Sequence, residues 1–540
     1  MKKYIIGIVF LISVFLLSCA DQLEVTPPNS IIDEQIKEIL ASGDDEKIEL
    51  ILGSMANGMP GLLNSSGLSG AGTADGRYRS WQGQNAMRNL EGNDIVFGAR
   101  NLSIFGSDEY YLRDFISPAV DKNSYYWQAA WSIITSANKM LNYLDEETVG
   151  SIPKLQEFKA RGLVVRAFAY SYLMENYQDS YLLGGKDKPG IMLYDFYSPT
   201  QEYKPRASST DTYNFIKNDL TNAILLFKAS EHETKIGYTT DNPKDIDLSV
   251  AKFILARVSL ITGDWPTAIS ASDDILENYP DLMGEDVYGG INNVGTDTDP
   301  EIRPETNGFL FNDVNPEVIL GWPVGEAITA HNSWMNPFGE GNGGEGEGYA
   351  RIDNRIYEQI DDRDYRKNVF MATDFGDYTY PTNKTKRFVP AYTNLKFAAT
   401  HGIGSDDKKN VGTVTCYYMR SSEVLLMKAE AQARAGNEPE AKKTLNVLLA
   451  ARTKAGETPL TVDNYSSMNG MSALQMVQLQ TRIELWGENG SEFFNNKRWN
   501  ILVDRKSSTN HVDKGTYSVD KMTLKIPEME MLYNPKAVQN

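Results

Sequence analysis

The chain has 540 residues, with 72 Asp and Glu against 53 Lys and Arg, so its formal net charge at pH 7 is −19. A surface this acidic argues against binding to nucleic acid and against electrostatic docking on anionic lipid. The length suffices for one large or two ordinary domains with a substantial hydrophobic core.

The N-terminus has the pattern of an export signal. A cationic start precedes an apolar run over residues 4–17, which fits the signal-peptide window of about 7–15 residues and is shorter than the roughly 20 residues of a membrane-spanning helix. The run closes with Leu-Leu-Ser-Cys-Ala, which resembles a bacterial lipobox. We therefore predict that residues 1–18 are removed and that Cys19 is acylated. A plain secreted protein with an incidental cysteine is the alternative.

The two cysteines have different expected roles. Acylation of Cys19 would leave Cys416 without a partner, so no disulfide is expected within the chain. Cys416 lies in the β-branched and aromatic run of residues 414–418 and is expected to be a small buried hydrophobe. The histidines are far apart and lack metal-ligand spacing, so no metal or cofactor is predicted. They are His232, His331, His401 and His511.

The next segments are a linker, a helix and a glycine-rich region. Residues 19–32 are polar and contain two prolines, which predicts an extended linker. Apolar residues at helical spacing predict a first amphipathic helix over residues 33–52. Residues 53–80 hold seven glycines, which we interpret as a long irregular loop region rather than a helix. It ends at Trp81, after a run of charged and aromatic residues.

Helical periodicity is clear in the next part of the chain. Apolar residues at i, i+4 and i+7 form a stripe over residues 127–144, and this face is predicted to be buried. Residues 158–177 are apolar nearly all round, which predicts a helix that is covered on most sides. A further helix is predicted over residues 213–227, with the cluster Ser209–Asp211 as its N-terminal cap.

Two stretches of the chain repeat one frame, G-[DN]-x-P-x-A, at residues 263–268 and 436–441. Glycine takes the left-handed conformation that ends a first helix, and Asp or Asn caps the next. Proline is tolerated in the first turn, and alanine permits close helix crossing. The frame therefore predicts two helix–turn–helix units that resemble degenerate tetratricopeptide repeats.

Between the two repeats lies a second loop-rich region, residues 284–348, with thirteen glycines. A structureless run of this length is uncommon inside a compact protein unless it is functional or disordered. Disordered segments are poor in aromatic residues, so the aromatics in or beside this region favour a functional role. These aromatics are Trp322, Trp334, Phe338 and Tyr349.

Further short motifs occur in one order along the chain. They are the lipobox followed by Asp21 and Glu24, Trp127–Trp131 with Ala137-Asn138, Phe158–Arg161, Arg166–Tyr170, Asp219-Leu220 with Ala223, Val250–Lys252, Ala256-Arg257, Gly263–Trp265, Tyr418–Glu423, Ala429–Ala431, Arg482–Leu485, Lys497–Trp499, Ile526–Glu528, Asn534-Pro535 and Gln539-Asn540. Together they resemble the SusD/RagB-like family, surface lipoproteins that bacteria of the Bacteroides group pair with a TonB-dependent outer-membrane transporter. The resemblance spans nearly the whole mature chain.

The chain departs from the family pattern at residues 488–496. The family's usual E-G-x-R-x-x-D-L appears here with an extra residue, with Glu492 where arginine is common and Asn495 where aspartate is common. The buried ion pair that the family pattern implies is therefore not expected in its usual form. The flanking motifs keep the expected fold unchanged.

The resemblance implies a mainly α fold, in which about four tetratricopeptide-like helix pairs form a scaffold and irregular loop-rich segments build a ligand-binding half. We expect one domain over residues 33–540, with loop-rich insertions at about 53–115 and 284–410. The implied activity is capture of an oligosaccharide or polysaccharide and its delivery to a SusC-like TonB-dependent transporter, without breaking a bond. The implied location is the outer face of the outer membrane, reached through the lipid anchor alone.

Sugar-binding surfaces need flat aromatic faces together with groups that hydrogen-bond to hydroxyls. Glycine-rich loops that carry such groups are the natural candidates, and the alternative is that each aromatic only anchors its loop to the scaffold. Four tryptophans on helical stripes, Trp127, Trp131, Trp265 and Trp486, are expected to be structural instead. The candidate ligand-binding residues are Asp75, Arg77, Tyr78, Trp81, Trp322, Trp334 and Tyr349.

A glycoside hydrolase and a peptide-binding protein are the alternative functions. A glycoside hydrolase needs only two carboxylates, and residues 361–364 (Asp-Asp-Arg-Asp) look suggestive, but a solvated turn or a helix start explains them more simply. The common hydrolase and phosphate-binding motifs are absent from the sequence. Residues 297–301 hint at calcium but lack the pattern of an EF-hand loop. The same fold could also bind a peptide in place of a glycan.

Overall fold

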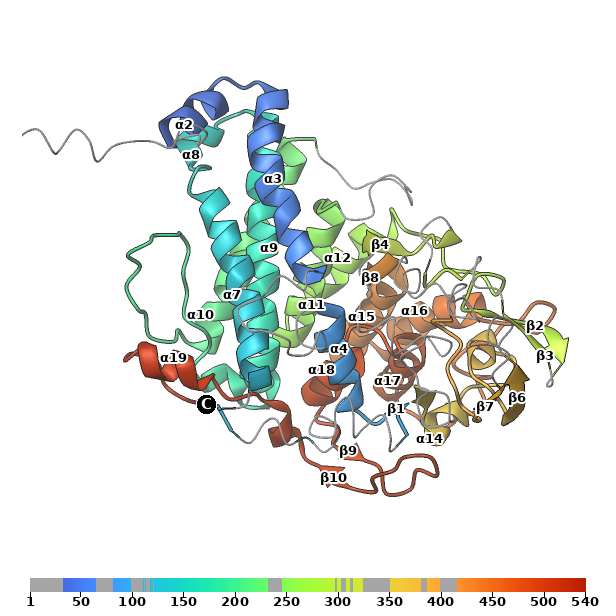
Figure 1. Ribbon diagram of the computed structural model, residues 1–540. Coiled ribbons are helices and arrows are strands. Elements are labelled where there is room, and N and C mark those ends of the chain that lie inside the picture. Colours follow the sequence, from blue (N-terminus) through green and yellow to red (C-terminus); the bar gives the residue numbers. More distant parts are fainter. Residues whose placement is uncertain are drawn as a thin grey trace, which may run out of the picture.

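The computed structural model describes residues 33–64, 81–98, 110, 112, 117–119, 121–231, 245–296, 299–302, 307–310, 314–323, 350–379, 386–398 and 415–540. Its regular structure is mainly helical, as predicted (Figure 1). The α-helices are α2 (Asp33–Ala41), α3 (Asp45–Asn64), α4 (Trp81–Leu90), α7 (Asp121–Leu141), α8 (Glu146–Val149), α9 (Pro153–Tyr177), α10 (Ser209–Ala229), α11 (Leu248–Thr262), α12 (Trp265–Leu276), α14 (Asn354–Tyr357), α15 (Ser421–Arg434), α16 (Glu438–Ala451), α17 (Ala473–Glu484), α18 (Ser491–Trp499) and α19 (Glu528–Tyr533).

The strands of the described residues are short and form two-stranded antiparallel pairs, β1 with β5, β2 with β3, β4 with β8, β6 with β7 and β9 with β10. Their bounds are β1 (Ile95–Val96), β2 (Ile291–Thr296), β3 (Asp299–Ile302), β4 (Val318–Pro323), β5 (Arg351–Ile352), β6 (Phe375–Thr379), β7 (Lys386–Val389), β8 (Thr415–Arg420), β9 (Val503–Asp504) and β10 (Thr516–Tyr517). The 3₁₀ helices are η1 (Tyr181–Leu183), η2 (Gly185–Asp187), η6 (Tyr365–Val369) and η9 (Val519–Met522).

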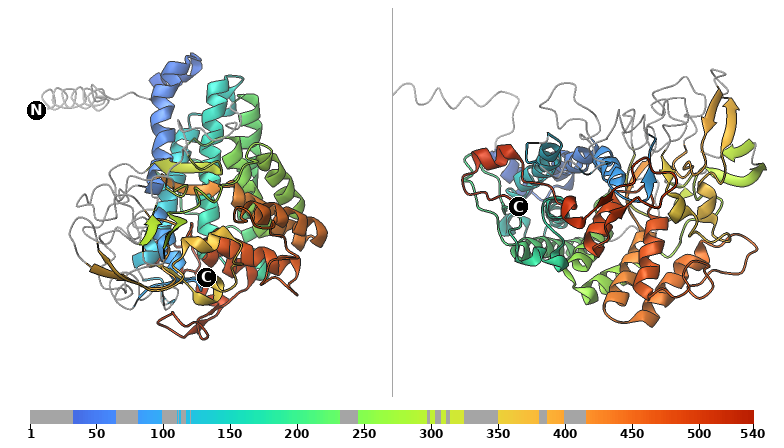
Figure 2. Two further views of the ribbon diagram at one scale, coloured as in Figure 1. Left: turned by 90° about the vertical axis from the view of Figure 1, so that its right-hand side faces the viewer. Right: turned by 90° about the horizontal axis from the view of Figure 1, so that it is seen from below.

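The long helices pack on one another largely in the order of the sequence. Helix α7 packs on α9, α9 on α10, α10 on α11, α11 on α12, α12 on α15 and α15 on α16, while α3 covers α7 and α9. Seen from below, α10, α12 and α16 follow one side of the molecule, and α4, β1 and the yellow strands lie along the other side (Figure 2, right). This is the predicted tetratricopeptide-like scaffold with a second, less regular half.

Helix α9 lies at the centre of the scaffold and is buried along most of its length, as its apolar composition predicts. Arg166, a buried charged residue of this helix, is held by polar groups of the two neighbouring helices. The guanidinium donates to the carboxylate of Asp219 on α10, at 2.7 and 2.8 Å, and to the side-chain oxygen of Asn138 on α7, at 2.9 Å. A buried ion pair of this kind joins three neighbouring helices with satisfied polar groups.

The cap of α10 lies one residue before the predicted cluster. Ser208 is the N-cap, and its hydroxyl oxygen accepts a hydrogen bond from the backbone N–H of Asp211 at 3.0 Å. The hydroxyl in turn donates to the carboxylate of Asp211 at 2.6 Å. Helix α10 begins at Ser209, before the predicted start at residue 213, so the cluster Ser209–Asp211 forms its first turn and the prediction that this cluster caps the helix was wrong.

Both predicted helix–turn–helix units are present. Gly263 (φ +81°) ends α11 and Gly436 (φ +82°) follows α15, each in the left-handed region. The side chains of Asp264 and Asn437 cap the following helices by accepting from the backbone N–H three residues on, each at 3.4 Å. The shared sequence frame therefore produces the same turn twice because each residue type meets a local backbone requirement.

Replacing Gly436 with alanine is expected to lower the free energy of unfolding by about 1–2 kcal/mol, because an L-residue is strained at this φ. A Cβ at Gly436 meets no atom within 4 Å, so the cost is that of the backbone alone. Gly263→Ala should cost about the same, because its nearest neighbour, Leu182, is 43% exposed and can turn aside. Urea unfolding measures both changes. Gly436→Asn is the control and should cost less, since Asn tolerates this region.

The first helix differs from its prediction. The expected single helix over 33–52 is two helices, α2 and α3, separated by a turn at Gly43 (φ +65°). Helix α3 then continues through Gly53 to Asn64, so the irregular region predicted from residue 53 is wrong for residues 53–64. A helical glycine costs about 1 kcal/mol relative to alanine, and the packing of α3 on α7 and α9 outweighs this cost.

Candidate ligand-binding face

Only part of the predicted site lies in the described part of the chain. Trp81 is the first residue of α4, and Trp322 lies on β4, opposite Cys416 of β8. Five candidates lie outside the described residues, and so does Cys19, so their grouping on one surface stays a prediction. These five are Asp75, Arg77, Tyr78, Trp334 and Tyr349.

The structure does bring together the chain segments that follow the two loop-rich regions. Helix α4, which begins at Trp81, leads into β1, and β1 pairs with β5 in the register Ile95 to Ile352. The backbone N–H of Asp353 also donates to the carbonyl of Asp94 at 2.9 Å. Strand β5 begins two residues after Tyr349. Segments that are more than 250 residues apart in the sequence are thus hydrogen-bonded to each other.

The base of this β1–β5 pairing is a buried polar cluster. Arg482 of α17 donates to the Asp94 carboxylate at 2.9 Å, and the Trp486 indole N–H donates to the Asp94 carbonyl at 2.9 Å. The carboxylate of Glu492 accepts the backbone N–H groups of Asn93, at 2.6 Å, and Asp94, at 3.0 Å. Burial, followed by the nearby charge of Asp94, raises the pKa of Glu492 to about 7. The position that departs from the family pattern therefore holds a carboxylate that binds backbone.

His511 belongs to the same cluster and is held in its neutral form. Burial, together with the positive charge of Arg505, lowers the pKa of His511 to about 4. Its Nε2 lies 2.8 Å from the Asn93 carbonyl and its Nδ1 lies 2.6 Å from the Tyr110 hydroxyl. Nε2 therefore donates to the carbonyl while Nδ1 accepts from the phenol. With both ring nitrogens engaged by protein groups, this histidine is structural.

A larger buried cluster, the ion-pair core, lies between α15, α17 and the segment that contains η6. Its centre is Glu484, whose carboxylate accepts from the guanidinium groups of Arg452, at 2.8 and 3.1 Å, and Arg420, at 3.2 Å. These arginines hold the pKa of Glu484 well below its usual value, against the opposing effect of burial. The ion-pair core has four carboxylates and four cations, which are Glu317, Asp364, Glu484, Glu488, Arg366, Lys396, Arg420 and Arg452.

The acidic run at residues 361–364 belongs partly to this core. Asp364 is fully buried and caps η6 by accepting from the backbone N–H of Arg366 at 3.0 Å. Asp361 is also buried and accepts from the backbone N–H of Ser466 at 2.8 Å. The prediction of a helix start is confirmed, whereas the prediction of a solvated turn is wrong for these two residues. Because both carboxylates are engaged and buried, they do not form the accessible pair that a hydrolase needs.

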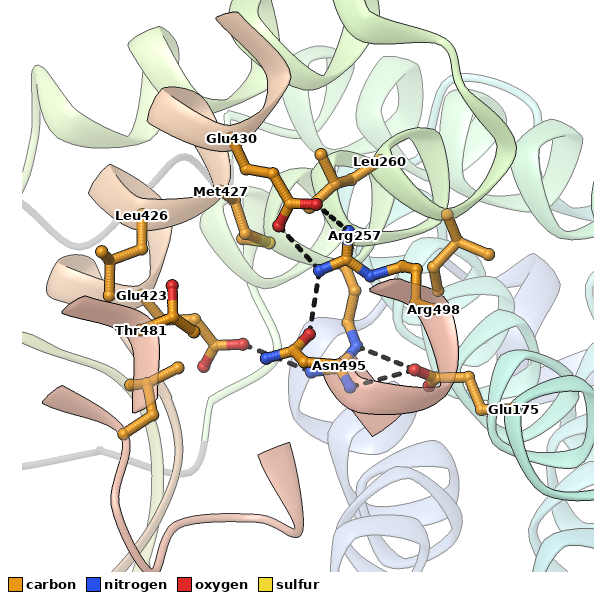
Figure 3. Close-up of a pocket in the computed structure, with 12 residues that line it drawn as sticks. Glu175, Arg257, Leu260, Glu423, Leu426, Met427, Glu430, Thr481, Asn495 and Arg498 are labelled. Carbon is orange, nitrogen blue, oxygen red and sulfur yellow. Dashed lines mark hydrogen bonds and ion pairs between the residues drawn. The ribbon is translucent and has the colours of Figure 1, made fainter. Parts of the chain in front are cut away.

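A recess of about 380 Å³, part of it open to solvent, lies where α9, α11, α15 and α18 approach one another. Figure 3 shows that its charged side chains face each other in pairs. Arg257 donates to Glu175, at 3.0 and 3.3 Å, and to Glu423, at 3.2 Å. Arg498 donates to Glu430 at 2.8 Å and to the side-chain oxygen of Asn495 at 2.9 Å. These pairs join the helices, so we interpret the recess as a structural seam.

Glu423 should make the stability of the protein depend on pH near neutrality. Burial raises its pKa to about 7, more than Arg257 lowers it, whereas an unperturbed Glu has a pKa of about 4.3. The folded state therefore keeps this proton to higher pH, and the associated stability is present below about pH 4 and lost as the pH rises through 7. In Glu423→Gln this loss should disappear, so the free energy of unfolding of the variant relative to wild type should rise between pH 5 and 8.

Urea unfolding at several pH values measures this change. Glu430→Gln is the matched control, because Arg498 and Arg434 hold the pKa of Glu430 below its usual value despite burial. Its effect should be constant between pH 5 and 8, where Glu430 is ionised in both states. Parallel curves for wild type and Glu423→Gln would contradict the assignment.

The four tryptophans predicted to be structural lie in the hydrophobic core or pack against it. In the described part of the chain, no helix is long and apolar enough to cross a membrane. Within these same residues, His, Cys, Asp and Glu side chains nowhere gather in groups of three or more that could hold a metal ion.

Solved structures of other proteins have a similar fold. A SusD-like carbohydrate binding protein from Bacteroides vulgatus superposes with a TM-score of 0.64 at 20% identity, covering 92% of this chain and 97% of that one. Surface glycan-binding protein A from Bacteroides thetaiotaomicron, in complex with laminarihexaose, superposes with a TM-score of 0.61 at 17% identity, covering 94% and 99%. At these identities the likeness concerns the fold.

Sequence comparison identifies the family. A SusD-like protein of Bacteroides ovatus is 30% identical over 187 residues, and this match covers 32% of each chain, so it spans about a third of that relative. The sequence model of the SusD family matches residues 106–539, which is well over half of the chain. The protein therefore belongs to the SusD family.

Proposed function

We propose that this protein is a cell-surface lipoprotein that captures an oligosaccharide and passes it to a SusC-like TonB-dependent transporter. Membership of the SusD family supports a binding role, and one protein of similar fold carries laminarihexaose. The observation that carries the proposal is the β1–β5 pairing, which joins the segments adjoining both loop-rich regions. Two loop-rich regions whose adjoining segments are hydrogen-bonded to each other are suited to form one ligand-binding face.

The chemistry of the loop residues supports a glycan as the ligand. Trp, Tyr, Asp and Arg supply the aromatic faces and hydroxyl-binding groups that an oligosaccharide needs. The described polar clusters, by contrast, are buried and internally paired, so they are suited to holding the scaffold rather than to binding a solute. We therefore place binding in the loops and assign no catalytic residue.

The membrane arrangement is part of the same proposal. Acylated Cys19 would tether the protein to the outer face of the outer membrane, with Asp21 and Glu24 as the export signal that the resemblance implies. Residues 19–32 would then link the anchor to α2, and the helical scaffold would face the transporter. Ligand binding would shift the protein between an open and a closed position over the transporter. Single-particle images of the complex showing one unchanged pose with and without ligand would contradict this.

The binding role is tested by screening the mature protein on a glycan array alongside a peptide library. We expect oligosaccharide binding, with Trp81→Ala and Trp334→Ala each weakening it by roughly tenfold or more, as removal of a buried aromatic contact typically does. Calorimetry with the strongest array hit measures the change. Tyr533→Ala is the control, because Tyr533 is 58% exposed on α19, far from α4 (Figure 1).

The other outcomes are equally informative. Unchanged affinity in both Trp variants would remove the site assignment while leaving the binding role. Binding of peptides alone would show that the family fold serves the other ligand class. Release of shorter sugars from the array hit would instead identify a hydrolase.

A further inference from the structure

The turn between α4 and β1 is held by groups from the C-terminal part of the chain. The two backbone N–H groups of Asn93 and Asp94 both donate to the carboxylate of Glu492. The carbonyl of Asn93 accepts from His511, and the carbonyl of Asp94 accepts from Trp486. Every backbone polar group of this dipeptide is thus bound by side chains some 400 residues away. Both residues are buried, whereas most turns lie at the surface and bond to their own neighbours or to water.

Gly92 has no side chain and so leaves the space that the Glu492 carboxylate occupies. A Cβ placed on Gly92 would overlap the carboxylate of Glu492, and its three nearest heavy atoms all belong to that side chain. Gly92 does not have a left-handed φ, so its backbone would itself accept alanine. The atoms closest to a side chain at residue 92 would therefore be those of the Glu492 carboxylate. This close approach gives the carboxylate access to the next two backbone N–H groups.

The turn leads directly into strand β1, which pairs with β5. Asp94 precedes β1, and its carbonyl also accepts from the backbone N–H of Asp353, which follows β5. Glu492 lies in the first turn of α18, and its side chain is also held by the amide of Asn496 at 2.8 Å. The carboxylate therefore connects a scaffold helix to the place where β1 meets β5.

We propose that Glu492 is a positioning residue whose carboxylate clamps Asn93 and Asp94 and thereby fixes the β1–β5 pairing, which joins the segments that follow the two loop-rich regions. The meaning of this pairing for ligand capture rests on the proposed function. The clamp itself does not. A carboxylate that accepts two backbone N–H groups in a buried site forms charge-assisted hydrogen bonds, which are about twice as strong as neutral ones.

Hydrogen exchange followed by mass spectrometry tests the clamp on the full mature chain without any ligand. In Glu492→Gln, exchange in residues 91–98 should speed up at least tenfold, because the amide replaces one acceptor with an N–H donor. The same acceleration is expected in residues 350–353, which Glu492 does not contact. A merely local role would leave that second segment unchanged.

Gly92→Ala supplies an independent variant, because the new methyl group displaces the carboxylate without removing it. It should accelerate exchange in the same two segments. In a Glu492→Ala background, adding Gly92→Ala should have no further effect, since the atoms that it would meet are gone. Glu430→Gln is the control, because it removes a buried carboxylate that binds α18 from the other side through Arg498.

The proposal is supported by acceleration confined to residues 91–98 and 350–353 in both single variants and by the loss of the Gly92→Ala effect in the double variant. It is overturned if residues 350–353 keep wild-type exchange, or if Glu430→Gln produces the same pattern. Failure of the glycan array to find an oligosaccharide would contradict the proposed function and leave these results unaffected.

Discussion

Replacing Glu484 with glutamine is expected to lower the free energy of unfolding by about 3–5 kcal/mol, the usual cost of breaking a buried ion pair from one side. The side chain of Glu484 is fully buried and accepts from Arg366, Arg420 and Arg452. Its loss would leave the ion-pair core with four cations and three carboxylates. These three arginines are themselves almost fully buried, so water cannot compensate the excess charge.

Guanidinium chloride unfolding monitored by circular dichroism measures this effect. Glu440→Gln is the matched control, because the Glu440 side chain is 48% exposed on α16 and lies 3.7 Å from Lys443. Exposed pairs contribute little, so this control should change the free energy of unfolding by about 0.5 kcal/mol or less. A Glu484 variant as stable as the control would show that the ion-pair core does not need its central carboxylate.

Replacing Cys19 with alanine is expected to move the protein from the membrane fraction to the soluble fraction almost completely. Each acyl chain contributes roughly 0.8 kcal/mol per buried CH₂, and two chains together give stable anchoring. The acidic surface of the chain provides no electrostatic substitute for the lipid. Cell fractionation together with incorporation of radiolabelled palmitate measures the change.

Cys416→Ala provides the control for this experiment, because Cys416 is the other cysteine of the chain and lies on β8. It should leave both fractionation and labelling unchanged. A Cys19 variant that still carries label and sediments with outer membranes would disprove the lipobox. Release of the wild-type protein into the medium would favour plain secretion.

Local signals explain which parts of the fold were predictable. Helices such as α9 follow from periodicity, and the turns at Gly263 and Gly436 follow from residue types that satisfy a backbone requirement within a few positions. Helix α3 was mispredicted because its glycines lower helix propensity, while its partners α7 and α9 lie far along the chain. Propensity is a weak prior that tertiary packing readily overrides.

The polar clusters were the least predictable feature, because their members also lie far apart in the sequence. The sequence around Asp364 shows only an acidic turn, because a group that binds its carboxylate lies 101 residues away in the chain. This group is Tyr465, whose hydroxyl donates to Asp364 at 3.1 Å. The sequence did mark Glu492 as a departure from the family pattern, which located the clamp. It did not name Asn93 or Asp94 as partners, because no local pattern links residues 400 positions apart.

The aromatic candidates remain a prediction from composition. Their glycine-rich surroundings indicate a binding surface, but glycine-rich backbone does not specify where a side chain points. That the segments adjoining the two loop-rich regions lie together is known only from the structure, in which β1 pairs with β5. The sequence therefore predicts the regions of the candidate site, and it does not predict their geometry.

The ion-pair core also has a consequence for when this protein folds. Its members are drawn from positions between Glu317 and Glu488, so none of its central bonds can form until most of the chain has been synthesised. Contacts between distant residues slow folding, because loop-closure entropy is lost before the contact is gained. A slow final step would lengthen the time that a newly made chain stays unfolded, and the same interactions would then slow the unfolding of the completed fold.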